Sequence, residues 1–570
     1  MEIWRINMQD QSLRREPVPE TWDRLGGRAL SARILLDEVP ADCEPLGPYN
    51  KLVVAPGLLV GHMLTSCDRI SFGGKSPLTR GIKESNAGGS TGLYMTNLGM
   101  KALVIEGQPD GGDRTGGWWV LRLGADGARC EDAKDLEGLG VYEASARLLS
   151  RYGDKVAIAV IGPAGEMRLS AAGIQNLDKD NVPSRIAGRG GLGAVMGSKR
   201  LKAIVIDDTG GTRPALADSG AFKRAQKLFT QNTLGHPQTK SYQEYGTAGS
   251  VKMCNAFGAL PTRNFSSGRF EGADAISGET LRETLLARGG EGETTHACMP
   301  GCVVKCSNAF ADSNGKLIVS PIEYETLGLM GSNLGIDNLD MVARLNWETN
   351  DLGLDTIDTG AALGVAAEAG LMQFGDGKRA LELLAEIRRG TPLGRILGHG
   401  AATTGKVFGV TRVPVVKGQA MAAYEPRAMK GTGTTYATSP QGADHTAGNT
   451  LRAKLDHLDP KANVAASRGA QITMAGYDTL GACIFAGFGF MVQPEVIAEL
   501  LNTRYGWQVA PDILQLLGKE TLTLEREFNR RAGFTAADDR IPEYMRTEPL
   551  PPHNSVFDVA ESDLDGIFNW

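Results

Sequence analysis

Short runs of apolar residues separated by polar turns dominate the first 208 residues of the chain. Runs of four to eight residues that end at Gly, Pro or Asp are typical of strands. One stretch in this part, Tyr142 to Arg151, has apolar positions three and four apart and predicts a helix. The runs that we interpret as strands are Lys51-Leu-Val-Val-Ala, Ala102-Leu-Val-Ile-Glu, Trp118-Trp-Val-Leu-Arg, Val156-Ala-Ile-Ala-Val-Ile and Leu201-Lys-Ala-Ile-Val-Ile.

The hydrophobic pattern becomes helical after a polar segment, Asp207-Asp-Thr-Gly-Gly-Thr-Arg-Pro214, which has the composition of a linker. Beyond it, apolar residues recur at spacings of three and four, and a further block opens near Val415. We therefore expect an α+β fold, with a β-rich domain over residues 1–208 and two mainly helical domains over 209–415 and 416–570. The predicted helices run from Gly220 to Phe229, Met341 to Leu352, Thr359 to Leu371, Gly377 to Arg389, Pro494 to Arg504 and Pro511 to Arg531.

The composition excludes some classes of partner. The net charge is −6 and no run of five like charges occurs, so nucleic acid is not expected as the main partner. The first residues are charged, and no segment reaches the ~18 consecutive apolar residues of a membrane span. With eight cysteines and no secretory signal, the chain is expected in the reducing cytoplasm, where clustered thiols bind metals more often than they pair.

Glycine is unusually frequent: 74 of the 570 residues, about 13%, are glycine, against a usual ~7%. Two loops are especially rich in it, Ser85-Asn-Ala-Gly-Gly-Ser-Thr-Gly92 and Ala187-Gly-Arg-Gly-Gly-Leu-Gly193, which suits backbone packed closely around a large ligand. The second loop contains G-x-G-x-x-G, but a dinucleotide site needs an apolar strand before the loop and a long helix after it. The preceding residues, 178–185, are polar. A nest of backbone amides for phosphates, with Arg189 and Lys199 supplying charge, is the better interpretation.

Three cysteines near the middle of the chain, Cys298, Cys302 and Cys306, have C-x3-C-x3-C spacing. Thiolates this close together in sequence can bind three corners of one iron–sulfur cube. A cube needs a fourth ligand, and the only later cysteine is Cys483. The working hypothesis is that these four cysteines bind one [4Fe–4S] cluster.

Other uses of these thiols stay open at this point. Zinc sites usually have paired C-x2-C motifs, which differ from one triplet plus a distant cysteine. A radical-SAM cluster uses a similar triplet, normally near the start of a barrel, and structural thiols need no metal. The remaining cysteines stand alone and are interpreted as small core residues: Cys43, Cys67, Cys130 and Cys254.

The two helical blocks share a short motif. Gly353-Leu-Asp355-Thr-Ile and Gly476-Tyr-Asp478-Thr-Leu both read G-x-D-T followed by Ile or Leu. Two related carboxylates could bind the two halves of a pseudo-symmetric ligand, although a motif this short also arises by chance.

Taken in their order along the chain, the glycine-rich loops, the cysteine triplet, the repeated aspartates and Cys483 resemble those of the aldehyde:ferredoxin oxidoreductase family. Members of that family carry tungsten, or sometimes molybdenum, on two pyranopterins. The resemblance extends from Leu25-Gly-Gly-Arg28 to Glu525-Arg-Glu-Phe528, and the C-x3-C start of the triplet is similar to bacterial members with electron-carrying subunits. It implies that the N-terminal β domain forms a base for the cofactor and that the two helical domains close over it.

The resemblance also implies which residues bind the cofactors. The heavy metal would be held by pterin dithiolenes and not by side chains, and a Mg²⁺ ion would join the pterin phosphates. Carboxylates accept well from pterin N–H groups, and phosphates favour backbone amides and arginine. The matching positions are Arg69 between the cluster and a pterin, Asn86 and Gly88 near the magnesium, Arg189 and Gly190 on the second phosphate loop, and Asp355 and Asp478 against the pterin rings.

For catalysis, the family positions match Glu325 and His445, with Glu323 as the alternative register of the glutamate. The implied reaction oxidises an aldehyde with water and passes electrons through the cluster to a ferredoxin or a ferredoxin-like subunit, in an oligomer or a multi-subunit complex. His296, next to the triplet, is expected to pack or tune and not to ligate. Some members bind a lone iron through Glu-x-x-His; the comparable place reads Glu348-Thr-Asn-Asp351, so that iron is not predicted.

Two rival functions follow from the same residues. A catalytic subunit of an aromatic acyl-CoA reductase in this family would use the same cofactors but would need a wide, basic entrance for the CoA thioester. A non-enzymatic iron–sulfur electron carrier would bind a cluster without tungsten, and the glycine-rich loops argue against it. The sequence leaves the aldehyde and the choice between tungsten and molybdenum open.

Overall fold

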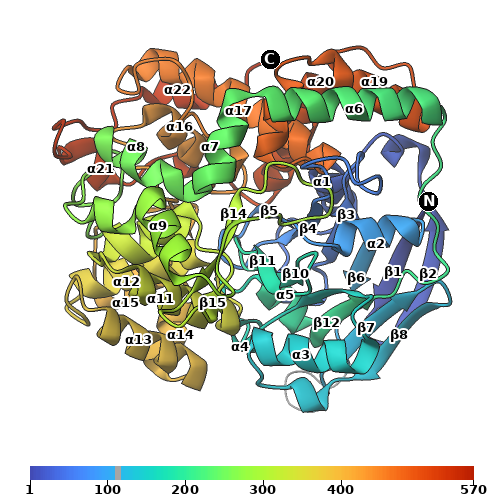
Figure 1. The fold of residues 1–570 in the computed structure, drawn as a ribbon, viewed down its shortest axis with the longest axis horizontal. Helices are drawn as coiled ribbons and strands as arrows, with labels where there is room; N and C mark the ends of the chain where they lie inside the picture. The colour runs from blue at the N-terminus through green and yellow to red at the C-terminus, as the bar shows by residue number, and fades with distance from the viewer. Residues whose placement is uncertain (110–116) are drawn as a thin grey trace.

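The computed structural model describes residues 1–109 and 117–570. Its N-terminal region, blue to cyan in Figure 1, contains two six-stranded sheets. The first sheet has the order β2-β1-β6-β3-β4-β5, with β1 Glu2–Asn7, β2 Ser12–Pro17, β3 Leu52–Pro56, β4 Ile70–Lys75, β5 Ile82–Ala87 and β6 Met100–Glu106. The second has the order β11-β10-β9-β12-β7-β8, with β7 Trp119–Gly124, β8 Gly127–Asp132, β9 Ala157–Val160, β10 Ile174–Leu177, β11 Pro183–Ala187 and β12 Leu201–Ile206.

Successive side chains along a strand point to opposite faces of the sheet, and in the first sheet both faces are buried. In β3, Leu52 and Val54 belong to the core shared with the second sheet, whereas Val53 and Ala55 belong to a core on the opposite side. Helix α1 (Gly27–Glu38) covers that opposite side, which explains why β3 reads as a continuous apolar run.

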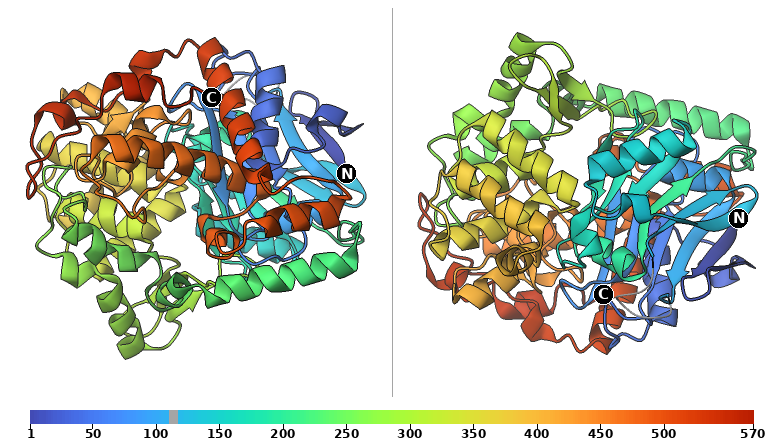
Figure 2. Two further views of the ribbon diagram at one scale, coloured as in Figure 1. Left: turned by 90° about the horizontal axis from the view of Figure 1, so that it is seen from above. Right: turned by 90° about the horizontal axis from the view of Figure 1, so that it is seen from below.

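Helices from the far end of the sequence also pack on this base. Helix α20 (Ile513–Arg531) contacts both α1 and helix α17 (Pro460–Leu480), and Figure 2 shows these orange and red helices against the blue region. The long helix α6 (Ser219–Gly235) packs in turn on α18 (Gly487–Phe490) and α19 (Glu495–Tyr505). Segments more than 200 residues apart therefore meet above the sheets.

The middle region, green to yellow in Figure 1, has the largest hydrophobic core of the described residues and is mainly helical. A small sheet interrupts it, formed by β13 (Glu293–His296), β14 (Ser307–Ala311) and β15 (Leu317–Val319), and the cysteine triplet lies in the loop between β13 and β14. Its principal helices are α7 Pro237–Tyr245, α8 Ser250–Ala256, α9 Gly278–Arg288, α11 Leu339–Leu352, α12 Thr356–Glu368, α13 Gly377–Arg389, α14 Pro392–Gly398 and α15 Ala401–Phe408. The last region adds α16 Lys430–Thr438, α21 Glu543–Thr547 and α22 Glu561–Asp565.

The predicted α+β class is confirmed, and each of the predicted helices and strands has a counterpart. Helix α13 has the predicted bounds, and α3 (Val141–Tyr152) extends the predicted helix by one residue at each end. Strands β4 and β5 were missed. Ile70-Ser-Phe-Gly-Gly-Lys contains buried glycines, and Ile82-Lys-Glu-Ser-Asn-Ala contains polar residues that are mostly buried.

The loop with G-x-G-x-x-G does follow a strand, β11, contrary to the expectation from its polar sequence. The helix after the loop, α5 (Leu192–Ser198), has only seven residues, and β10 and β9 separate β11 from β12 in the sheet. A dinucleotide fingerprint lies in a β-α-β unit of adjacent parallel strands, so this loop is not one.

No single helix in the described ranges is long and apolar enough to cross a membrane. One pair bent by 100°, Ile484–Phe490 with Glu495–Tyr505, meets the length and composition test only when the two are taken together.

Candidate active site

The structure brings Cys483 next to the cysteine triplet. The Cys483 backbone N–H donates to the carbonyl of Ser66 (2.8 Å), and the Ser66 hydroxyl lies 3.6 Å from Cys302 Sγ. Burial raises the pKa of the Cys298 thiol to about 12, and Cys302 and Cys483 add to the rise. The N-terminal base and both later regions therefore all contribute to one thiol-lined site.

The spacing of the thiols argues against a single metal ion. A tetrahedral zinc ion with bonds of ~2.3 Å would hold sulfurs about 3.8 Å apart. Among the described residues, which include all eight cysteines, no three cysteine sulfurs lie within 4.8 Å of one another, and all eight thiols are free. The donor set fits a larger inorganic centre better than one ion.

Gly88 lets the first glycine-rich loop approach the triplet. A Cβ atom at Gly88 would lie 3.2 Å from Cys298 Sγ, and the N–H of the next residue, Gly89, donates to the Cys298 carbonyl (3.0 Å). A side chain at this position would occupy the space beside the sulfur.

Arg69 connects the thiols to Asp478. Its Nε donates to the Asn86 side-chain oxygen, and the Asn86 amide donates to Asp478 Oδ1 (3.1 Å). Burial raises the pKa of the Cys483 thiol, and the positive charge of Arg69 partly offsets that rise. Three of the predicted cofactor residues, Arg69, Asn86 and Asp478, thus form one hydrogen-bonded row beside the cysteines.

Asp478 is held from its other side by Arg28, for which no binding role was predicted. Arg28 donates to Asp478 Oδ2 (3.1 Å) and makes two further bonds, of 2.7 and 2.8 Å, to Glu525. All three side chains are at most 5% exposed. Burial raises the pKa of Asp478 to about 6, and burial together with Asp478 raises that of nearby Glu84 to about 8.

The polar row continues through the centre of the molecule. Gln441 donates to Glu525 Oε1 (2.8 Å), and Lys83 donates to Gln441 (3.2 Å) and to Asp444 (2.6 Å). Burial opposes the charge on Asp444, but Lys83 and Arg189 outweigh it and hold the pKa of Asp444 well below its usual value. The row connects the surroundings of the cysteines with the residue next to His445.

Arg189 lies among three carboxylates. Its guanidinium nitrogens are 4.0 Å from Asp355, 3.9 Å from Asp358 and 3.9 Å from Asp444. Arg189 Nε and Nη1 and both carboxylate oxygens of Asp358 are buried without a hydrogen-bond partner among the described residues. Such orphaned groups need a partner. The Arg189 nitrogens are donors and suit ligand acceptors such as phosphate oxygens, whereas the Asp358 carboxylate accepts and suits ligand N–H donors.

Lys83 lies against the second glycine-rich loop, where Lys199 was expected. Gly190 (φ +82°) is required because a Cβ atom there would lie 2.4 Å from the Lys83 side chain. Lys199, expected to supply charge to the loop, instead donates to the carbonyls of Asn50 (2.7 Å) and Gly107 (3.2 Å), and burial lowers its pKa to about 7. Lys83 is therefore the lysine beside this loop.

Glu325 and His445 meet at the far end of the polar row. His445 Nε2 lies 3.1 Å from Glu325 Oε1, and both side chains keep about 15% of their surface exposed, at 16% and 15%. Burial opposes the charge on Glu325, but His445 and the Tyr424 hydroxyl outweigh it and hold the pKa of Glu325 below its usual value. The Tyr424 ring centroid is 5.7 Å from that of His445.

The alternative glutamate has other partners. Glu323 accepts from the hydroxyls of Thr247 and Ser307 and lies 3.8 Å from Arg185. The structure therefore pairs Glu325, and not Glu323, with His445.

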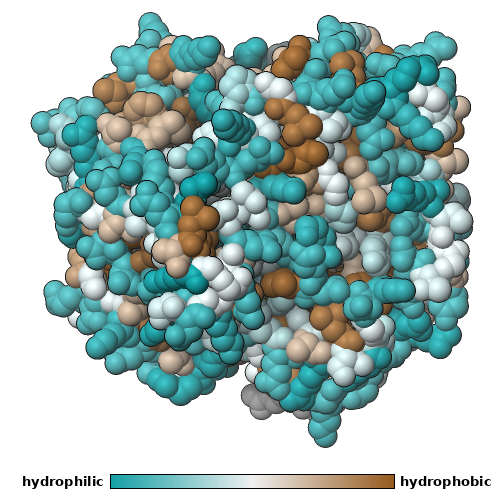
Figure 3. Space-filling view, in the orientation of Figure 1, coloured by the Kyte–Doolittle hydropathy of each residue, from teal (hydrophilic) through white to brown (hydrophobic). Residues whose placement is uncertain are grey.

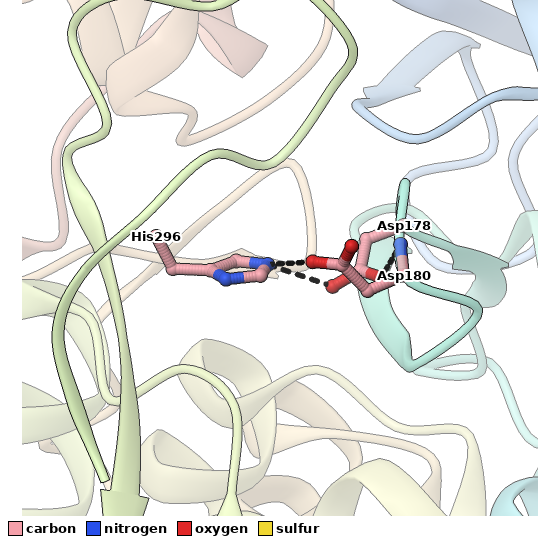
Figure 4. A group of neighbouring side chains, drawn as sticks. All are labelled: Asp178, Asp180 and His296. Carbon is pink, nitrogen blue, oxygen red and sulfur yellow. Dashed lines mark hydrogen bonds and ion pairs between the residues drawn. The ribbon is translucent and has the colours of Figure 1, made fainter. Parts of the chain in front are cut away.

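His296 is surrounded by carboxylates (Figure 4). Its Nε2 lies 3.1 Å from Asp178 and 3.6 Å from Asp180, and its Nδ1 lies 3.0 Å from Glu293. The bond to Asp178 raises the pKa of His296. Both ring nitrogens of His296 therefore have carboxylate partners, and the imidazole forms ion pairs close to the thiols.

The place where some family members bind a lone iron is occupied by an ion pair. Glu348 and Asp351 both bind Arg388, at 3.0 and 2.9 Å.

Comparison with known proteins identifies the family. Family models described as aldehyde ferredoxin oxidoreductase, N-terminal domain, and aldehyde ferredoxin oxidoreductase, domains 2 and 3, match residues 3–208 and 224–565. The chain is 31% identical over 587 residues to the tungsten-containing aldehyde ferredoxin oxidoreductase of Pyrococcus horikoshii, covering 96% of this chain and 92% of that one. It is also 31% identical to the enzyme of the same name from Thermococcus kodakarensis, and the match covers 94% of this chain and 89% of that one.

Two further proteins are similar at lower identity. A Pyrococcus furiosus protein named as the WOR-like subunit of an aliphatic sulfonate oxidoreductase is 27% identical, covering 92% of this chain and 85% of that one. The solved active site complex BamBC of benzoyl coenzyme A reductase contains a chain with the same fold, with a TM-score of 0.77 and 19% identity. The match covers 95% of this chain and 90% of that one. The matched models and relatives span nearly the whole chain, and the protein belongs to the aldehyde ferredoxin oxidoreductase family of oxidoreductases.

Proposed function

We propose that this protein oxidises aldehydes to carboxylic acids with water and passes the electrons to a ferredoxin or a ferredoxin-like subunit. The observation that carries the proposal is the position of the Glu325–His445 pair, 3.1 Å apart, at one end of a buried polar row whose other end lies beside four cysteines. That arrangement combines an acid–base pair with a site suited to an electron-carrying centre.

The residues of the row fit a tungsten bis-pyranopterin cofactor. The orphaned carboxylate of Asp358 and the buried carboxylates of Asp355 and Asp478 would accept from the pterin rings, and the orphaned donors of Arg189 would face the phosphates. Asn86, Gly88 and Gly190 would lie along the phosphates and a Mg²⁺ ion. The cysteines would hold one [4Fe–4S] cluster: Cys298, Cys302, Cys306 and Cys483.

The balanced reaction is R-CHO + H2O → R-COOH + 2 H⁺ + 2 e⁻. When bound, the tungsten cofactor supplies the two-electron acceptor and a Lewis acid. Glu325, kept charged by His445 and Tyr424, would accept a proton from the water that attacks the aldehyde carbon. His445 would donate to the aldehyde oxygen from Nδ1, which has no hydrogen-bond partner among the described residues.

Elemental analysis and a substrate panel test this proposal together. We expect about four iron atoms and about one tungsten per purified chain, and aldehyde-dependent reduction of benzyl viologen. Zinc in place of iron, or no dye reduction with any aldehyde in protein that contains tungsten, would remove the proposal.

The competing activity is reduction of an aromatic acyl-CoA, since the benzoyl-CoA reductase complex has the same fold. Benzoyl-CoA is therefore included in the panel, with reduced dye as the electron donor. Oxidation of the dye by benzoyl-CoA, without any response to aldehydes, would favour this second function.

A further inference from the structure

Three aromatic rings pack against the candidate cluster ligands. This aromatic box consists of Tyr242, Phe485 and Phe488, whose ring centroids lie 4.6–5.7 Å apart. The box belongs to one apolar group with the three cysteines of the triplet. The Phe485 N–H also donates to Cys483 Sγ (3.3 Å). Figure 3 shows hydrophobic side chains, in brown, reaching the surface on the face that carries α6 and α7, the helix of Tyr242. The aromatic box thus adjoins all four cysteines.

The guanidinium of Arg452 lies over this box. Its central carbon is 4.5 Å from the ring centroid of Tyr242, 5.3 Å from that of Phe488 and 5.6 Å from that of Phe485. Aromatic rings attract a cation at such distances through their quadrupoles. Burial lowers the pKa of Arg452 to about 10, so the side chain still carries its full charge at neutral pH.

No acid pairs with Arg452 in residues 1–109 and 117–570, where its nitrogens have no carboxylate oxygen within 4.0 Å. Burial alone shifts its pKa, with no contribution from a carboxylate. The acid nearest to it in sequence, Asp456, accepts instead from the Leu458 N–H (2.9 Å). Glu244 and Glu495, the acids nearest in sequence to Tyr242 and Phe488, are also beyond ion-pair distance of the guanidinium.

The way in which Arg452 is held decides how far its charge acts. A carboxylate partner would hold the guanidinium but would cancel most of its field, whereas aromatic rings hold a cation and leave its net charge in place. The effect is visible at His236, whose ring stacks on Phe488 with centroids 4.8 Å apart. Burial and the charge of Arg452 both lower the pKa of His236.

We propose that Arg452, held by the aromatic box, raises the reduction potential of the iron–sulfur cluster bound by the four cysteines. The inference rests on the proposed function in one respect, that these cysteines hold an electron-carrying cluster. Arg452 acts through its field and does not touch the cluster. A nearby positive charge that no acid neutralises stabilises the more negative, reduced state of the cluster relative to the oxidised one.

The electron balance of this step is simple. One of the two electrons released by the proposed aldehyde oxidation enters the oxidised cluster, which becomes reduced and gains one negative charge. The electron then leaves for the external acceptor, and the second electron follows. No bond forms or breaks at the cluster, and Arg452 neither gains nor loses a proton. A higher potential makes the cluster a better acceptor in the first of these transfers.

A series of charges at position 452 tests the proposal by redox titration of the metal-loaded protein, followed by electron paramagnetic resonance. At a fixed solution potential, Arg452→Gln should lower the ratio of reduced to oxidised cluster about three- to tenfold. A tenfold change is ~59 mV for a one-electron couple. Arg452→Glu, which changes the charge by two, should lower the ratio by about the square of that factor, and Arg452→Lys should stay within about twofold of the parent.

Arg15 supplies a matched control. Its guanidinium lies 4.0 Å from the ring centroid of Trp4, which is the same kind of contact. Arg15 is on β2, at the opposite edge of the first sheet from β5, and the loop with Gly88 that follows β5 approaches the cysteines. Arg15→Gln should therefore leave the ratio of reduced to oxidised cluster within about 1.5-fold of the parent.

Iron content and the shape of the resonance signal, measured on the same samples, should match the parent in every variant. Equal potentials in the parent, Arg452→Gln and Arg452→Glu would overturn the role of Arg452 and leave the proposed aldehyde oxidation in place. A loss as large in Arg452→Lys as in Arg452→Gln would also overturn it, because packing and not charge would then set the potential. A graded fall in protein that responds to no aldehyde would support Arg452 and remove the proposed substrate. Protein without any cluster signal would overturn both.

Discussion

Asp355 and Asp478 lie in the same five-residue motif but at opposite ends of their helices. Asp355 is the N-cap of α12, where its carboxylate accepts from the N–H groups of Ile357 and Asp358. Asp478 is in the last turn of α17 and binds Arg28 and Asn86. One carboxylate is oriented by the start of its own helix, the other by side chains from the N-terminal base.

The two aspartates also lead to different chemistry. From Asp478, Asn86 and Arg69 lead to the cysteines, whereas from Asp355, Arg189 leads to Asp444 beside His445. A pseudo-symmetric ligand could thus be held by unlike surroundings, with the proposed electron transfer on one side and the proposed proton transfer on the other. This division makes separate predictions for the two sides.

The largest effect is expected on the Asp355 side, at Glu325. Because the proposed general base is lost, Glu325→Gln should lower kcat for aldehyde oxidation by ~10²–10⁴-fold. Iron and tungsten content should match the parent, measured on the same samples. The paired control is Glu323→Gln, which removes a carboxylate bonded to Thr247 and Ser307 and should affect the rate far less. Activity of Glu325→Gln close to that of the parent would contradict the assignment.

On the cysteine side, Cys483→Ser should remove iron. A hydroxyl is a poorer ligand for iron than a thiolate, so we expect less than about half the iron of the parent and an altered electron paramagnetic resonance signal. Cys254→Ser offers a comparison, because this buried cysteine lies beside Tyr324 and away from the other thiols. If both variants retain the parent's iron, the fourth ligand is not Cys483.

The Arg28 contacts should dominate stability near Asp478. Arg28→Gln leaves Glu525 and Asp478 buried without their charged partner, which costs about 3–5 kcal/mol and should lower the midpoint of thermal unfolding by several degrees. The exposed pair Arg80–Glu44, 57% and 62% exposed, supplies the control. Arg80→Gln should change stability by less than about 1 kcal/mol. Similar effects of the two substitutions would mean that the Arg28 pair is not needed for the fold.

The smallest expected effect is a difference in pH dependence. The folded-state pKa of Asp478 is raised from 3.8 to about 6, so its contribution to stability is present below about pH 4 and is lost as the pH rises through 6. The pKa of Glu325 is lowered from 4.5, so its contribution is present above pH 4.5 and is lost as the pH falls.

Denaturant unfolding of cofactor-free protein between pH 4 and 6 measures how the free energy of unfolding of each variant changes with pH. Relative to the parent, Asp478→Asn should gain stability with rising pH and Glu325→Gln should lose it, each on the order of 1 kcal/mol. If the stability of both variants, relative to the parent, changed in the same direction with rising pH, the proposed difference between the Asp478 side and the Glu325 side would be contradicted.

The sequence was sufficient for the elements with strong periodicity and for residues in compact motifs. Helix α13 and the proximity of Cys483 to the triplet were predicted from local patterns and the family resemblance. Arg28 and Glu525 lie in the two motifs that bound the family resemblance, but their pairing was not predicted, because 497 residues separate them and no pattern in the sequence relates the two.

Ser66, Cys298 and Cys483 come from three regions of the chain that meet only in the finished fold. During synthesis on the ribosome, the triplet emerges long before Cys483 does. For the proposed cluster, iron delivered at that stage would find only three of its four cysteines, so we expect the cluster to be completed on the released polypeptide. Translation products that end before Cys483 should leave the ribosome unable to complete the centre.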